Sequence, residues 1–203
     1  MKKCAVLHEP GDIVTLAGTR FVVLDVERRG SLPDSLFLLA LESVGASEFG
    51  SSNNYAESDL KKAVDKWLED MGKRGLDNAK LIPREIDLTT LDGSGCYGKL
   101  SVKAAPLTLD EAREYADIIP NAERWCWLAT GWSGPSKSDG DLALFVDSNG
   151  DWYDISCSYS CGFRPALKAP SILFEDSEAG LDLSKIPTDD LLQEIHRRLA
   201  EKA

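Results

Sequence analysis

Histidine is nearly absent, which removes the commonest building block of catalytic and metal centres. The two histidines of the 203-residue chain, His8 and His196, lie at its opposite ends. A Ser/His/Asp or Cys/His centre would have to bring one of them across the fold, so neither is expected. No C-x2-C pair occurs among the cysteines, so a Cys/His zinc site is not indicated either. We expect a protein without metal or cofactor.

Long apolar runs are missing as well. A membrane-spanning helix needs about 20 consecutive apolar residues, and no run approaches this length. Before His8 the chain has only four consecutive apolar residues, whereas a secretory signal needs roughly 7–15. We therefore expect no export by that route, no membrane partner, and reduced thiols at Cys4, Cys96, Cys126, Cys157 and Cys161.

Positive charge is in deficit. Lys and Arg number 23 against 34 Asp and Glu, which gives a formal net charge of −11 and a pI near 4.7. A general binder of nucleic-acid backbones needs a basic face, so no nucleic-acid partner is expected. Apolar residues make up 43% of the chain, which is enough for a hydrophobic core.

The N-terminal part of the chain predicts strands. Residues 12–26 predict a hairpin, because two β-rich runs flank a short turn at residues 17–19. Residues 35–42 are almost continuously apolar, which suits a strand buried on both faces. Residues 43–57 are polar and contain glycine, and are expected to form a loop.

Two helices are predicted next. Apolar residues recur at helical spacing from Ser58, a suitable N-cap, to Gly72. A second helix is expected from Thr108, whose spacing to Glu111 is that of a capping box, to Pro120.

The remaining sequence is again typical of strands, and the whole order predicts an α+β domain. Trp125 and Trp127 alternate on one strand and are both expected in the core. The predicted elements are a strand at 125–129, a hairpin at 142–147 and 152–156, and a terminal strand or corner at 161–167.

Three parts of the chain are distinguished by composition. Residues 1–169 are expected to form the domain, residues 170–187 an acidic linker, and residues 188–203 a C-terminal amphipathic helix. A helix of this length is marginal in isolation, so helix 188–202 is expected to dock on this domain, on a second copy or on a partner.

The ordered set of segments resembles a family of bacterial and phage domains, without an assigned activity, that is related to the C-type-lectin-like fold. The resemblance covers about residues 10–168, and its closing motif is the most specific part. The matching segments are 11–14, 21–25, 36–42, the helices 58–68 and 108–116, 125–128, and Gly162-Phe163-Arg164-Pro165-Ala166-Leu167.

This resemblance implies a C-type-lectin-like α+β fold of mixed short strands and two helices, followed here by a C-terminal helix. The closing motif is also similar to that of retroelement variable binding proteins and of formylglycine-generating enzymes. The implied function is a non-catalytic ligand- or protein-binding module of bacterial, prophage or phage origin, cytoplasmic or in a virion. Three alternatives stay open: a retroelement-diversified variable protein, an oxidase, and a phage assembly protein that docks through its C-terminal helix.

Several residues admit a chemical and a plain interpretation. Cys157 and Cys161 could serve redox or metal chemistry, but reduced structural cysteines are expected. Asp147–Asp151 has spaced oxygens that calcium prefers, but an Asn-Gly hairpin turn explains the same residues. Arg164 is expected to bond backbone carbonyls of the fold rather than a ligand.

Aromatic residues interleaved with Ser and Asp are typical of adaptable binding surfaces. They gather in the loop after Trp127 and in the last hairpin, which in the resembling fold converge on one surface. The predicted binding residues are Trp132, Asp151, Trp152, Tyr153, Asp154, Ser156, Ser158 and Tyr159.

Overall fold

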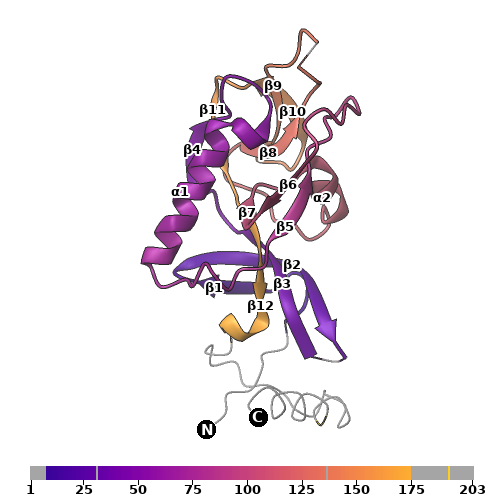
Figure 1. Ribbon diagram of the computed structural model, residues 1–203. Coiled ribbons are helices and arrows are strands. Elements are labelled where there is room, and N and C mark those ends of the chain that lie inside the picture. Colours follow the sequence, from indigo (N-terminus) through magenta and orange to yellow (C-terminus); the bar gives the residue numbers. More distant parts are fainter. Residues whose placement is uncertain (1–7, 31, 136, 175–191, 193–203) are drawn as a thin grey trace.

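The computed structural model describes residues 8–30, 32–135 and 137–174, together with residue 192. In this part of the chain two five-stranded sheets, one two-stranded sheet and two α-helices confirm the predicted α+β class (Figure 1). The strands are β1 Ile13–Leu16, β2 Thr19–Arg29, β3 Leu32–Ala40, β4 Gly45–Glu48, β5 Arg84–Asp87, β6 Lys99–Val102, β7 Ala104–Ala105, β8 Cys126–Gly131, β9 Leu142–Val146, β10 Trp152–Ser156, β11 Ser160–Phe163 and β12 Ala166–Pro170. The helices are α1 Asp59–Lys73 and α2 Leu109–Glu114, and the 3-10 turns are η1 Tyr55–Glu57 and η2 Ser171–Phe174.

The first sheet has the strand order β1-β2-β3-β12-β7. The predicted N-terminal hairpin is confirmed: Ala17 and Gly18 both have positive φ, 47° and 75°, as a two-residue turn between antiparallel strands requires. β3 pairs with β2 on one side and with β12 on the other, so the early and late strands of the domain are neighbours.

Both faces of this sheet are covered, as the continuous apolar runs predict. Phe21 and Leu38 belong to the larger hydrophobic core, and Val22 and Leu24 to a smaller one. α1 packs against the larger core through one stripe of residues, and α2 contributes to the smaller core. The first sheet therefore lies between two cores.

The second sheet has the order β10-β9-β8-β11-β4. The prediction of a loop at 43–57 is wrong in part, because this segment contains β4, which pairs with β11. The segment 161–167 is a corner: β11 ends in the second sheet, and β12 begins in the first after Arg164-Pro165. Figure 1 shows β1 to β3 in the lower half of the view and β8 to β11 in the upper half.

The helices follow their predicted starts more closely than their ends. The Ser58 side chain accepts the Lys61 N–H, and the capping box of Thr108 and Glu111 is present. α2 ends well before Pro120, because residues after it make turn-like bonds such as Ile118 N–H to the Tyr115 carbonyl at 2.9 Å.

The C-terminal parts of the predicted organisation are described only in η2. Phe174 of η2 is buried and packs edge-on against His8, with ring centroids 5.8 Å apart. The predicted helix 188–203, apart from residue 192, and most of the predicted linker lie outside the described residues.

Arg164 has the structural role predicted for it. Its side chain is buried, with Nε donating to the Ala40 carbonyl at 2.7 Å and Nη1 to the Pro120 carbonyl at 2.9 Å. It therefore ties the end of β3 and the segment after α2 to the corner between the two sheets.

Candidate functional site

The predicted binding residues lie mainly on β10 and in the turn that follows it. β10 is an edge strand of the second sheet. The exposed fractions of Trp152, Tyr153 and Tyr159 are 40%, 53% and 58%. Asp151, Asp154 and Ser158 are exposed too, and Ser156 is half-buried. The fold thus places Asp151, Trp152, Tyr153, Asp154 and Ser156 along this edge, and Ser158 and Tyr159 in the turn that leads from it to β11.

The expectation that these residues share one surface is wrong for β10 itself. Side chains alternate along a strand, so Trp152 and Asp154 face one side and Tyr153 the other. The ring contacts agree: Tyr153 lies 5.9 Å from Phe145, whereas the Arg113 guanidinium lies 5.1 Å from the centre of the Trp152 ring.

Trp132 departs further from the prediction. Its side chain is half-buried and packs against the smaller hydrophobic core, so it contributes to the fold. A tryptophan in a glycine-rich loop gives no sequence signal for this packing, because the core residues that it meets are distant in the chain.

Trp125 is a surface residue that the sequence pattern assigned to the core. Trp127 is buried and donates its Nε1–H to the Ser47 carbonyl at 2.9 Å, but Trp125 is 49% exposed. Trp125 stacks on Phe145 with ring centroids 4.8 Å apart. β8 begins only at residue 126, so Trp125 lies just before the strand, where the hydrophobic core no longer covers the side chains. The polar residues just before it are the sequence signal that could have revealed this.

An open groove of about 500 Å³ lies beside Trp125. Arg124 and Glu123 bring one charge of each sign to it, and Arg124 makes no ion pair with any described residue. A Cβ atom at Gly162 would lie 2.5 Å from Ser43 Oγ, 2.8 Å from Arg124 Cδ and 3.0 Å from the Trp125 carbonyl oxygen, so a larger residue here would force these groups to shift. The lining residues are Ala46, Glu123, Arg124, Trp125, Ser148, Ser160, Cys161 and Gly162.

The segment that builds this part of the second sheet is acidic. Residues 138–163 contain five aspartates and no lysine, arginine or histidine. Arg113 over Trp152 and Arg124 in the groove are nearby cations, but the five aspartates outnumber them, and this favours cationic partners. The five are Asp139, Asp141, Asp147, Asp151 and Asp154.

The turn between β9 and β10 uses its aspartate for structure. Asp147 Oδ1 accepts the backbone N–H groups of Asn149 at 2.8 Å and Asp151 at 3.0 Å, and Gly150 has a φ of 91°. This is the arrangement of a hairpin turn rather than a calcium loop. Across the described residues, no group of three or more His, Cys, Asp or Glu side chains is placed to hold a metal ion.

The described cysteines are free thiols, and three of them are buried. Burial raises the pKa of Cys157 to about 12 and that of Cys161 to about 11, and it raises the pKa of Cys126 as well. Thiols protonated at neutral pH are poor nucleophiles and poor metal ligands. Cys96 is the exposed member.

A smaller pocket of about 210 Å³ lies between β2 and α2, but its charges largely serve the fold. Arg84 is buried, pairs with Glu111 and lies 5.2 Å from the centre of the Phe37 ring. Lys168 pairs with Glu27 in the same pocket. Since these four charged groups form two ion pairs, we interpret the pocket as a structural ion-pair cluster.

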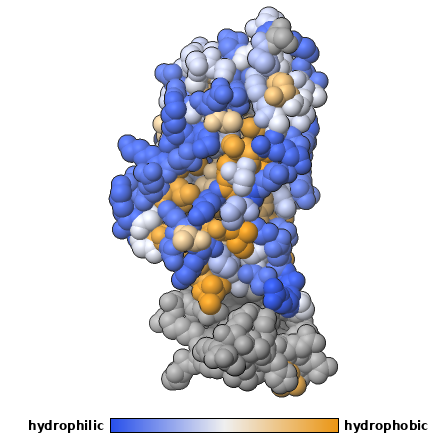
Figure 2. All heavy atoms as spheres, viewed as in Figure 1, coloured by the Kyte–Doolittle hydropathy of each residue, from blue (hydrophilic) through white to orange (hydrophobic). Residues whose placement is uncertain are grey.

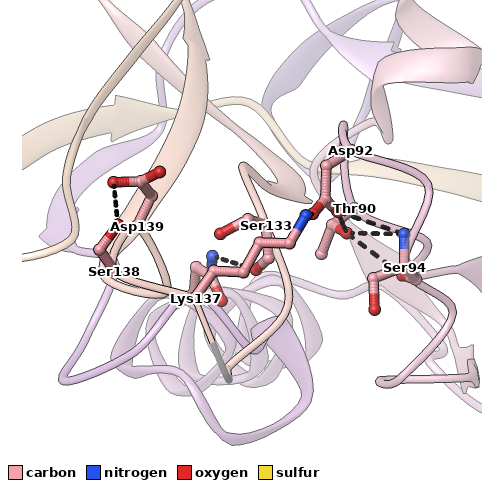
Figure 3. Close-up of polar contacts among 8 residues, drawn as sticks. Thr90, Asp92, Ser94, Ser133, Lys137, Ser138 and Asp139 are labelled. Carbon is pink, nitrogen blue, oxygen red and sulfur yellow. Dashed lines mark hydrogen bonds and ion pairs between the residues drawn. The ribbon is translucent and has the colours of Figure 1, made fainter.

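Polar contacts fix the long loop after β8 to the glycine-rich loop at 92–98. Figure 3 shows Lys137 reaching across to Asp92, with Nζ 2.5 Å from Oδ2, while Thr90 and the Ser94 backbone also bond that carboxylate. The ion pair with Lys137 and the bond from Thr90 lower the pKa of Asp92 to about 2. The glycine-rich loop thus supports the neighbouring loop.

Comparisons with known proteins add no relative. The chain matches no protein-family model, no curated protein and no solved structure. Of the helices that the structure describes, none has the length and apolar character needed to cross a membrane.

Proposed function

We propose that this chain is a non-catalytic module that binds a protein or a small ligand through the second sheet. The observation that carries the proposal is the position of the exposed aromatic side chains. Among the described residues, every large aromatic side chain that is exposed lies between residues 125 and 159, in the segment that forms β8 to β11. They lie on both faces of the second sheet, and we call them together the aromatic surface: Trp125, Trp152, Tyr153 and Tyr159.

The aromatic surface is amphipathic rather than uniformly apolar. Rigid aromatic rings supply contact area at little entropic cost, and the neighbouring Ser and Asp residues supply hydrogen bonds. In Figure 2 the upper part of the visible face, which includes the second sheet, is mainly blue to white, whereas orange atoms gather lower down beside α1. Such a surface suits reversible recognition of a polar or cationic partner.

An oxidase of the formylglycine-generating type has less support. That chemistry requires reactive thiols, but Cys157 and Cys161 are buried and their pKa values are raised. The assembly-protein alternative depends on helix 188–203, which lies outside the described residues.

The proposal also includes a C-type-lectin-like fold and a bacterial, prophage or phage origin. Each matching segment between residues 11 and 167 coincides with an observed strand, helix or corner, which supports a C-type-lectin-like fold. A bacterial, prophage or phage setting rests on the resemblance alone.

Arrayed glycans and random peptides, probed with the fluorescently labelled full chain, test this function. The Trp125→Ala, Tyr159→Ala double variant should lose the spots that the wild type binds. The matched control is Ile13→Ala, Ile172→Ala, because Ile13 is also 49% exposed and Ile172 is 57% exposed, but both lie outside the aromatic surface. Retention of the same spots by the aromatic variant, or no spot bound by the wild type, would contradict the proposal.

A further inference from the structure

We infer that β10 is a docking edge for an extended basic peptide segment of a partner protein, which adds to the second sheet as a further strand. This inference rests on the proposed function and names the partner that it takes. Edge strands present unpaired backbone groups, and strand addition is a recurrent mode of peptide recognition. Figure 1 shows β10 beside β9 in the upper part of the molecule.

The hydrogen-bond register identifies which backbone groups are available. The Asp147 N–H bonds the Asp151 carbonyl at 2.9 Å, and the Cys157 N–H bonds the Asp141 carbonyl at 2.7 Å. Hydrogen-bonded pairs alternate along an antiparallel ladder, so Tyr153 and Ile155 direct their backbone groups toward β9. The N–H and C=O groups of Trp152 and Asp154 therefore point outward from the sheet.

The other edges of the two large sheets are less suitable. Within the described residues, β1 and β4 have four residues each and β7 has two, whereas β10 has five. Two of the four residues of β1 are buried, and both residues of β7 are. β4 and β10 both have no buried residue, and both contain neither lysine nor proline, the residues that commonly protect an edge. The Ser47 carbonyl of β4 already accepts the Trp127 Nε1–H, however, and β10 is the longer strand. β10 is thus the edge most open to another strand.

The side chains define the composition of the incoming strand. On one face of β10 the exposed Asp154, whose carboxylate pairs with no described residue, lies next to Trp152, whose ring is covered by the Arg113 guanidinium. Arg113 is itself paired with Asp110, so a Lys or Arg cross-strand from Asp154 would be attracted to the Asp154 carboxylate. On the opposite face Tyr153 and Ile155 favour β-branched apolar residues. The pattern is an alternation of basic and β-branched residues.

Hydrogen exchange followed by NMR on the full chain tests strand addition. The probe is the blocked peptide Lys-Val-Lys-Val-Lys-Val-Lys. At saturation the amides of Trp152 and Asp154 should exchange more slowly by a factor of about ten or more. The amides of Tyr153 and Ile155 are already bonded to β9, so their exchange rates should change little. The matched control peptide, with Glu in place of each Lys, should bind far more weakly, because the aspartates repel it.

Two substitutions at one position separate backbone from charge. Asp154→Pro removes an outward N–H without removing a ladder bond, and it should abolish protection of the Trp152 amide. Asp154→Asn keeps that N–H, so it should weaken binding several-fold and leave the protection at saturation. If Asp154→Pro does not fold, a probe N-methylated at every valine replaces it and should lose binding.

Four results would overturn the inference: no binding of the lysine peptide at millimolar concentration, binding that leaves the Trp152 and Asp154 amides unprotected, equal binding of the glutamate peptide, and protection that grows with protein concentration alone. The last would make a second copy of the chain the occupant. None of these would remove array binding that depends on Trp125 and Tyr159, so the proposed function and the strand addition can fail separately.

Discussion

The two large sheets differ in how their burial changes from centre to edge. In the first sheet, Phe21 to Leu24 of β2 are all buried, and Leu36 and Leu38 of β3 are fully buried. In the second sheet all six residues of β8 are buried, but β10, two strands away, has no buried residue. Large rings are left in water at this edge, although burial would be favourable. The central strands of the first sheet thus contribute mainly to stability, whereas the β10 edge of the second sheet leaves aromatic rings available to a partner.

Thiol labelling should show the largest contrast, between the core side of the second sheet and the exposed glycine-rich loop. Cys157 and Cys161 are in the core, and their raised pKa values keep them protonated, so alkylation of the native protein should be about a hundredfold slower than for exposed Cys96. Mass spectrometry of time points with iodoacetamide measures the rates, and denaturant should equalise them. Fast native labelling of Cys157 would show that this sheet lacks a core face.

Truncation at the two sheets should separate their roles in stability. Leu38→Ala opens a cavity at a fully buried position of β3 and should lower the free energy of unfolding by about 2–5 kcal/mol. Tyr153→Ala on β10 should cost about 1 kcal/mol or less, mainly through its contact with Phe145. Urea denaturation of both variants measures the difference, and equal losses would break the comparison.

The corner between the sheets should have an intermediate effect. Arg164→Ala leaves the Ala40 and Pro120 carbonyls without their donors, at a cost of roughly 1–3 kcal/mol in unfolding free energy. Arg164→Lys should recover little, because one ammonium group does not reproduce the two-sided guanidinium fork. Thermal unfolding followed by circular dichroism measures both variants. A melting temperature unchanged in Arg164→Ala would show that the corner is held by other contacts.

The smallest stability effect is expected at the loop contact of Asp92 with Lys137. The pKa of Asp92 falls from 3.8 to about 2 on folding, so its contribution is present above pH 3.8 and lost as the pH falls toward 2. Asp92→Asn should therefore be slightly less stable than the wild type at neutral pH, and the difference should shrink as the pH falls from 4 through 2. Asp139→Asn in the neighbouring loop is the matched control. A difference of the same size at pH 4 and at pH 2 would point to a cause other than charge.

Local patterns predicted the local parts of the fold. The hairpin of β1 and β2, the buried β3, the hairpin of β9 and β10, the cap at Ser58 and the capping box at Thr108 all depend on residues close in sequence, and all are confirmed. Arg164 was predicted correctly, because a charged residue within a closing apolar motif must find acceptors.

Features that depend on distant partners were missed. β4 contains no β-branched or aromatic residue and forms through backbone pairing with β11, more than a hundred residues later. The alternation of Trp125 with Trp127 gives the face of each ring but not where the covering core ends. The split of the predicted binding residues over two faces of β10 follows from the same alternation and could have been foreseen.

Titration of the best array probe into the wild type and into the Trp125→Ala, Tyr159→Ala variant tests the central claim most directly, with melting temperatures measured on the same samples. We predict at least about tenfold weaker binding by the variant, because rigid aromatic anchors dominate such contacts, and melting temperatures within a few degrees of each other. Equal affinity, or unfolding of the variant at a much lower temperature, would show that these rings serve the fold and that the aromatic surface is not a binding site.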